Sequence, residues 1–311
     1  MGIQGIKIYQ RINVKEPIMI AGWPGMGNVA LESIDYLRRR LNAVAFAEID
    51  MCQFSAPDMI IVEDGVTKLP ELPRQVFYYT AKHPNLIIFE SEAQLGGIAG
   101  VNLMERILDL AQELKVWRIY TGAAFPLPIS HKEPSTVFGV ANEKHLKDFL
   151  IDYKVKIMEE GQISGLNGLL LGFAAKRGIE AICLLATMPQ YAINFPNPKA
   201  SKAIIEVLGE ILDIKVDMMK IDLLIQEIDK KMDMIEEKIK GIFPEVEKKD
   251  VEEVDLESEK VPNYIMEKIE KLFKEAKTDK KKAYALKEEL DRWDLYKLYE
   301  DRFLDLFKEH Q

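Results

Sequence analysis

The sequence has few of the residues on which disulfide frameworks and metal centres depend. Its 311 residues include only two cysteines and four histidines. Cys52 and Cys183 stand far apart, and no two histidines are spaced as an H-x-x-x-H or H-E-x-x-H pair. These absences exclude a disulfide scaffold, and we predict that the protein holds no metal. Cys183 lies within an apolar run and is expected to be an inert core residue.

Long apolar runs and an excess of basic residues are also missing. No window approaches the roughly 18 uninterrupted apolar residues of a membrane span, and the first residues lack the pattern of a signal peptide. The 51 acidic residues outnumber the 42 basic ones, which gives a net charge of −9. We therefore expect a cytoplasmic protein that binds neither membrane nor nucleic acid. Abundant lysine, glutamate and isoleucine are typical of a thermophile.

Charge is unevenly distributed along the chain. Charged residues make up about 21% of residues 1–215 but about 49% of residues 216–311. The first part is typical of a compact globule and the second of solvated helix. The sequence predicts four segments in all. They are a core domain (1–215), a coiled-coil-like helix (216–242), an acidic linker (243–262) and a C-terminal helical segment (263–311).

Within residues 1–215, short apolar runs alternate with segments of helical period. Examples are the strand-like run 18–21 and the helix-like segment that follows it, in which apolar residues recur at spacings of 4, 3 and 4. This alternation predicts an α/β core with a mostly parallel or mixed sheet between layers of helices. The two prolines of Phe125-Pro126-Leu127-Pro128 predict a stiff loop at that point.

A heptad pattern follows the core. Apolar residues recur at alternating spacings of 4 and 3, which is the signature of a coiled-coil seam. The seam needs a partner, either another copy of the chain or the globule itself. Isoleucine at both seam positions favours a trimer or tetramer over a dimer. The seam residues are Ile221, Ile225, Ile228, Met232, Ile235 and Ile239.

The C-terminal segment carries a stripe of aromatic residues at helical spacing. Such a helix is expected to be covered, either within the homo-oligomer or by another protein that it grips. The candidate partner-binding residues are Trp293, Tyr296, Tyr299, Phe303 and Phe307.

A glycine-rich loop between the first strand and its helix is the candidate ligand site. Glycines at a helix N-terminus let backbone N–H groups approach an anion, but the order G-x-x-G-x-G is neither a dinucleotide fingerprint nor a P-loop. A structural turn is the alternative reading. Carboxylates at strand ends supply candidate acid–base groups or Mg²⁺ ligands, or else cap turns. The candidate residues are Trp23, Gly25, Gly27, Asn28, Glu63 and Glu90.

No catalytic residue is predicted. Ser164 lacks the flanking glycines of a nucleophile elbow, since Gln162 and Leu166 occupy their positions. We expect Ser164 to cap the following helix instead.

Taken together, several motifs resemble one known family. They are Gly22 to Gly27, Pro57-Asp58 with Glu63-Asp64-Gly65, Thr121 to Ala124, Val137 to Ala141, Gly161 to Gly168 and Ala186 to Tyr191. In this order and spacing they are similar to blocks of the archaeal and bacterial relatives of eukaryotic proteasome assembly chaperones, over about residues 10–215.

The resemblance implies a phosphorylase/hydrolase-like α/β fold, no established catalysis, and homo-oligomers. For some archaeal members it implies binding to the α-ring of the 20S proteasome. Members are sometimes assigned to the ATP-grasp superfamily, whose glycine-rich hairpin lid and spaced Mg²⁺ carboxylates this sequence lacks. Members that dock on the proteasome end in a hydrophobic residue, then tyrosine, then any residue. This chain ends Glu309-His310-Gln311, which counts against docking in that way.

Two hypotheses follow. The first is a non-enzymatic, homo-oligomeric chaperone or adaptor that binds itself and proteasome α subunits and needs no cofactor. The second is a nucleotide-binding or ATP-dependent enzyme that uses the loop Gly25–Asn28 and the carboxylates of Glu63 and Glu90, with ATP as its ligand.

Overall fold

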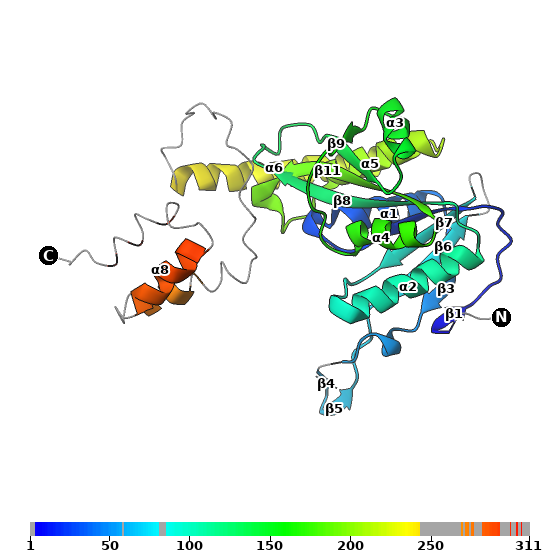
Figure 1. Ribbon diagram of the computed structural model, residues 1–311, viewed down its shortest axis with the longest axis horizontal. Helices are drawn as coiled ribbons and strands as arrows, with labels where there is room; N and C mark the ends of the chain where they lie inside the picture. Colours follow the sequence, from blue (N-terminus) through cyan, green and yellow to red (C-terminus); the bar gives the residue numbers. More distant parts are fainter. Residues whose placement is uncertain are drawn as a thin grey trace. The chain divides into compact units, whose positions relative to one another are not determined.

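The computed structural model describes residues 4–57, 59–80, 85–242, 269, 271–273, 275, 276, 282–292, 299, 303 and 306. The chain divides into two compact units, Met1–Pro244 and Glu245–Gln311. The first unit holds a mixed sheet of nine strands between layers of helices, shown in Figure 1. The predicted α/β core is confirmed.

The sheet has a central parallel part with antiparallel strand pairs toward both edges. β2 lies between β7 and β8 and is parallel to both, and β8 is parallel to β11. The order across the sheet is β1-β3-β6-β7-β2-β8-β11-β9-β10. The strands are β1 (Ile6–Ile8), β2 (Ile18–Gly22), β3 (Val44–Ile49), β6 (Gln75–Thr80), β7 (Leu86–Ser91), β8 (Arg118–Leu127), β9 (Val137–Ala141), β10 (Lys156–Ile157) and β11 (Glu180–Pro189).

Helices cover both faces of this sheet. One apolar cluster joins the sheet to α2 and α4, and a second joins the opposite face to α1, α3 and α5. Each helix therefore buries one apolar face against the sheet, as the helical periods predict. The helices are α1 (Val29–Arg40), α2 (Gly97–Glu113), α3 (His145–Asp152), α4 (Leu166–Lys176) and α5 (Pro198–Ile211), with short 3₁₀ turns η1 (Met26–Asn28), η2 (Met51–Gln53) and η3 (Gln190–Ala192).

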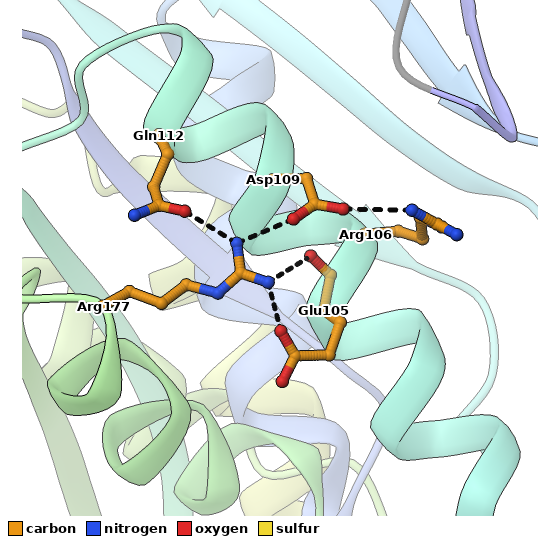
Figure 2. A network of polar contacts seen from close by, with 5 residues as sticks. All are labelled: Glu105, Arg106, Asp109, Gln112 and Arg177. Carbon is orange, nitrogen blue, oxygen red and sulfur yellow. Dashed lines mark hydrogen bonds and ion pairs between the residues drawn. The ribbon is translucent and has the colours of Figure 1, made fainter.

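An ion-pair network joins the outer sides of α2 and α4 (Figure 2). The guanidinium group of Arg177 donates to Asp109 Oδ1 and Gln112 Oε1, both at 2.8 Å, and also to Glu105. Arg106 in turn donates to Asp109 Oδ2 at 3.1 Å. Since Arg177 is largely buried, these contacts hold the two helices in a fixed relation.

The prediction of a loop at Phe125–Pro128 is wrong for the first three of these residues. β8 continues through Phe125, Pro126 and Leu127 and pairs with β11 along its whole length. Proline is tolerated here because β2 pairs with β8 only as far as Thr121, so beyond that point β8 has a sheet neighbour on one side alone.

A small hairpin stands apart from the main sheet. β4 (Ile61–Glu63) and β5 (Val66–Lys68) form a two-stranded sheet of their own, and Figure 1 shows it projecting from the unit. Asp64 and Gly65 connect the strands with φ values of 50° and 77°. Two central residues with positive φ are typical of the type I′ turn that closes a tight hairpin.

The last helix of the first unit, α6 (Met219–Ile242), begins after a break that follows α5. In the second unit, α8 (Lys282–Arg292) belongs to a separate apolar cluster that also contains Phe273, Tyr299 and Phe303. All of residues 243–262, the predicted acidic linker, lie outside the described residues.

Two features are absent from the described part of the chain. None of its helices has the length and apolar character that a membrane crossing requires. Nor do three or more histidine, cysteine, aspartate or glutamate side chains gather there in a group that could bind a metal ion.

Candidate functional site

The glycine loop begins at the carboxyl end of the central strand β2. Trp23, the first residue after β2, is fully buried and packs against Phe89 of β7, with 5.1 Å between ring centroids. In doubly wound sheets, ligands bind at the carboxyl ends of such central strands. The loop therefore lies where a ligand site is expected, but the side chain of its residue Trp23 is buried in the core.

Asn167 of α4 fixes the backbone of Trp23 on both sides. The Trp23 N–H donates to Asn167 Oδ1 at 3.1 Å, and Asn167 Nδ2 donates to the Trp23 carbonyl at 3.3 Å. The Thr121 hydroxyl also donates to Asn167 Oδ1, at 3.1 Å. A buried amide that satisfies a peptide on both its donor and its acceptor works as a structural clamp.

Gly27 and Asn28 turn the chain into α1 with left-handed backbone conformations. Their φ values are 59° and 51°. A Cβ atom on Gly27 would lie 2.9 Å from the Met188 methyl carbon, so glycine is needed here for space as well as for conformation. The Gly27 N–H donates to the Ile193 carbonyl at 2.8 Å, and Asn197 N–H donates to the Gly27 carbonyl at 2.9 Å.

Gln94 links this loop to the start of α4. Its side-chain amide donates to the Pro24 carbonyl, and its Oε1 accepts from the Leu166 N–H at 3.2 Å. The expectation that Ser164 caps α4 is wrong. Gly165 occupies the cap position, with φ of 83°, and Gln94 from another segment supplies the oxygen that a capping serine would provide.

Four of the loop's backbone donors are used within the protein. The N–H groups of Trp23, Gly27, Asn28 and Val29 each donate to a protein oxygen, and Pro24 has no N–H group. A shallow depression lies between Gly25–Asn28 and residues 193–196. This bonding is that of a structural turn, because a phosphate cradle needs free backbone donors aimed at one point.

The two candidate carboxylates lie away from this depression. Glu90 of β7 forms an ion pair with Arg38 of α1, with 2.7 Å between Oε1 and Nε. Burial raises the pKa of Glu90 to about 7, although the Arg38 guanidinium acts in the opposite direction. Glu63 is exposed on the hairpin and pairs with Lys68 at 2.7 Å. Neither carboxylate lines the depression at Gly25–Asn28.

The first half of the heptad seam packs on the chain's own core. Ile221 and Met232 are buried in the cluster that includes α1 and α5, and Ile228 packs against it. Ile225 lines a small pocket beside them. Ile235 and Ile239 lie in α6, but their side chains are outside the described residues.

A row of aspartates beside the seam fixes α6 to α5 and to the loop between β8 and β9. Asp222 pairs with Lys202 at 2.8 Å, Asp229 with Lys199 at 3.1 Å, and Asp233 with Lys132 at 2.9 Å. Spacings of 7 and 4 place these aspartates on one side of the helix. These three aspartates were not predicted from the sequence, although acidic residues at helical spacing beside an apolar seam indicate such a row.

Two members of the aromatic stripe are described. Tyr299 packs against Phe273, with ring centroids 5.6 Å apart, and Phe303 is buried in the same cluster of the second unit. Trp293, Tyr296 and Phe307 lie outside the described residues.

Asn167 and Gln94 are the functional residues of the loop that sequence reasoning missed. Asn167 did carry a signal, because it is the one strongly polar side chain in the uncharged stretch from Leu166 to Ala175. Its contact with Trp23 joins residues that are 144 positions apart, which a single sequence does not reveal.

These features define a class of protein. It is a doubly wound α/β scaffold in which the loop at the ligand-binding edge is bonded into the protein itself. The chain belongs to the PAC2 family, whose model matches residues 19–240, more than half of the sequence.

Three known proteins illustrate the similarity. MJ1210, an uncharacterized protein of Methanocaldococcus jannaschii, is 25% identical over 237 residues, which cover 75% of this chain and 86% of that protein. PbaB of Pyrococcus furiosus, described as an archaeal proteasome activator, is 26% identical with a TM-score of 0.63, and the match covers 74% of this chain and 98% of PbaB. PbaA of the same organism, described as an archaeal homolog of proteasome-assembly chaperone, shares the fold at 21% identity with a TM-score of 0.60, over 77% of this chain and 94% of PbaA.

Proposed function

We propose that this protein is a non-enzymatic, homo-oligomeric adaptor that acts in the cytoplasm and binds the α-ring of the 20S proteasome. The observation that carries this proposal is the similarity to PbaB. It extends over 98% of that proteasome activator at 26% identity, which is the whole of its fold. Membership of the PAC2 family supports the same assignment.

The geometry of the glycine loop supports a binding protein over an enzyme. Asn167, Gln94 and residues 193–197 take up several of the loop's backbone groups, and the candidate carboxylates pair with Arg38 and Lys68 elsewhere. These hydrogen bonds hold the glycine loop in one conformation at the edge of the α/β core. A nucleotide would have to displace several of these hydrogen bonds, each of which contributes about 1 kcal/mol net.

Binding to purified 20S particles tests the proposal. The full-length chain is mixed with 20S proteasomes, and complexes are separated by native electrophoresis and viewed by negative-stain microscopy. We expect density capping the α-ring and a changed rate of peptide hydrolysis by the 20S particle. Free migration of both components at micromolar concentration, with unchanged hydrolysis, would contradict the proposal.

Calorimetry with ATP, with and without Mg²⁺, tests the alternative function. We expect no heat of binding and no rise in melting temperature at millimolar nucleotide, because a ligand that binds the folded state must stabilise it. A saturable shift that disappears in Asn28→Ala, but not in Asn102→Ala on the surface of α2, would favour the nucleotide-binding alternative.

A further inference from the structure

The helix α6 is fixed to the core at its first turn. The Asp217 carboxylate accepts a hydrogen bond from the Met219 N–H at 3.0 Å, which caps the helix. Two side chains of α1 hold the same residue. The Tyr36 hydroxyl donates to the Asp217 carbonyl at 2.7 Å, and Arg40 Nη1 lies 3.2 Å from Asp217 Oδ2. The start of α6 is therefore anchored to α1 whatever the rest of the helix contacts.

The apolar contact between α6 and the core is incomplete. Ile221 and Met232 are buried, but Ile225 and Ile228 between them are only partly buried and line a cavity of about 20 Å³. A gap in a contact forfeits part of the dispersion attraction that close packing supplies. The later turns of α6 extend past the sheet in Figure 1. Since α5 buries apolar residues over its whole length, apolar burial attaches α6 less firmly than it attaches α5.

Ion pairs supply the rest of the attachment. Acidic side chains of α6 meet basic side chains of α5 and of the loop between β8 and β9. The pairs are Asp222–Lys202 at 2.8 Å, Asp229–Lys199 at 3.1 Å and Asp233–Lys132 at 2.9 Å. Asp233 also lies 3.3 Å from Nε2 of the buried His131. A hydrogen bond from Lys132 lowers the pKa of Asp233, and a hydrogen bond to Asp222 raises the pKa of Lys202, so these contacts favour the charged forms.

We propose that α6 is a hinged strap, anchored at Asp217 and fastened along its length by these ion pairs, which opens from the core when the pairs are screened or neutralised while the sheet stays folded. The proposal concerns the first unit alone and does not depend on the proposed function.

The position of α6 makes its opening a local event. The helix packs chiefly on α5, and α1, α3 and α5 cover the face of the sheet next to it. Its release therefore uncovers one side of α5 and leaves the sheet between its two layers. Local openings of this kind take less free energy than global unfolding.

The exposure of the pairs makes the strap sensitive to salt. The side chains of Asp222, Asp229 and Asp233 are between 37% and 47% exposed, so dissolved ions reach them. The screening length falls from about 10 Å at 0.1 M salt to about 3 Å at 1 M. Each exposed pair contributes little alone, but three pairs act together on one opening equilibrium.

Amide hydrogen exchange of the full chain at 50 mM and 1 M NaCl tests the strap. Exchange rates are corrected by the rate of the unfolded chain at the same salt. We expect exchange in residues 221–233 to rise at least about threefold at high salt, with no change in β2 and β8. Unchanged exchange in α6, or an equal rise in β2 and β8, would overturn the proposal.

Removal of the three acidic charges tests the role of the pairs. The combined variant Asp222→Asn, Asp229→Asn and Asp233→Asn keeps the size of each side chain. It should exchange faster in α6 already at 50 mM NaCl and lose the salt effect, while protection of β2 and β8 shows that it folds. A salt effect of full size in this variant would overturn the proposal. If the combined variant does not fold, Asp229→Asn alone decides, with a smaller change in the same direction.

Glu227→Gln is the matched control. Glu227 pairs with Lys231 of the same helix at 2.7 Å, so this variant removes a charge from α6 without touching the core. It should exchange as the wild type does, and a loss of protection equal to that of the combined variant would overturn the proposal. Opening within one chain is also independent of protein concentration. Exchange of α6 that slows as the concentration rises would place the pairs between copies and overturn the proposal as well.

Discussion

Single buried polar groups hold the glycine loop in place. Asn167 is 5% exposed and makes hydrogen bonds with both backbone groups of Trp23 and with the Thr121 hydroxyl. These contacts join α4 to the carboxyl end of β2 and to Thr121 within β8. The loop's shape thus depends on this side chain as well as on Gly27.

Replacing Asn167 by alanine should destabilise the protein by about 2–4 kcal/mol. The change leaves the Trp23 N–H and carbonyl buried without a partner, and each unsatisfied buried group costs about 1–3 kcal/mol. Urea unfolding followed by tryptophan fluorescence measures the loss. Asn102→Ala, at an exposed position of α2, is the control and should change the stability by less than about 0.5 kcal/mol. Equal effects of the two variants would contradict the clamp.

Glu90 should make the protein less stable as the pH rises. Burial raises its pKa to about 7 in the folded state, above the ordinary value of 4.5. Between these values the folded protein keeps a proton that the unfolded chain releases, so stability from this group is lost as the pH rises toward 7. In Glu90→Gln this dependence is absent. The stability of the variant relative to the wild type should therefore increase by up to about 3 kcal/mol from pH 4.5 to pH 8. A constant or falling difference in urea unfolding would contradict this assignment.

At the scale of elements, α6 shows that an apolar seam can be satisfied within one chain. Ile221 and Met232 are buried against the core, and three aspartates pair with Lys202, Lys199 and Lys132. The heptad spacing predicted the helix and its apolar side. It left open whether that side meets the globule or another copy, because a periodic pattern specifies a surface without specifying what covers it.

Replacing Met232 by alanine should loosen α6 and leave the sheet intact. Met232 is 4% exposed and Met234 is 57% exposed, so Met234→Ala is a matched control two residues away. A buried Met→Ala change costs about 2–5 kcal/mol, whereas the exposed one costs less than about 0.5 kcal/mol. Amide hydrogen exchange should rise in α6 and stay unchanged in β2 and β8. Because the contact is within one chain, the effect should not depend on protein concentration. A concentration-dependent effect would assign Met232 to a contact between copies.

The strands and helices of the core were largely predictable, while their long-range partners were not. Apolar run length and helical period located β2, α1 and α5 because these signals are local. β8 can extend through Pro126 because β2 ends at Gly22 and pairs with β8 only as far as Thr121. Beyond that point no strand needs a backbone N–H group from that side of β8. Similarly, the oxygen that caps α4 comes from Gln94, about 70 residues earlier. Such contacts depend on the sheet order, which one sequence does not contain.

At the scale of the whole molecule, each unit has a core of its own. The two large apolar clusters contain residues only from the first unit, and the third contains residues 269–306. The composition step near residue 215 does not coincide with this division, because α6 packs on the first unit up to at least Met232. A unit that ends at residue 244 should therefore fold by itself, whereas one that ends at residue 217 should not be equally stable.

Two fragments test this boundary. The fragment 1–244 should melt within about 5 °C of the first transition of the full chain, because it retains every described residue of both large clusters. The fragment 1–217 loses Ile221 and Met232 from the core and leaves Lys199 and Lys202 without their α6 partners. It should be less stable by several kcal/mol, since two buried apolar side chains alone account for about 3–6 kcal/mol. Differential scanning calorimetry distinguishes the cases. Equal melting of the two fragments would mean that α6 adds nothing to the core.

The fragment 1–244 also locates the proteasome contact. If it folds and still binds 20S particles, the first unit carries the contact. If it folds and does not bind, the contact belongs to residues 245–311.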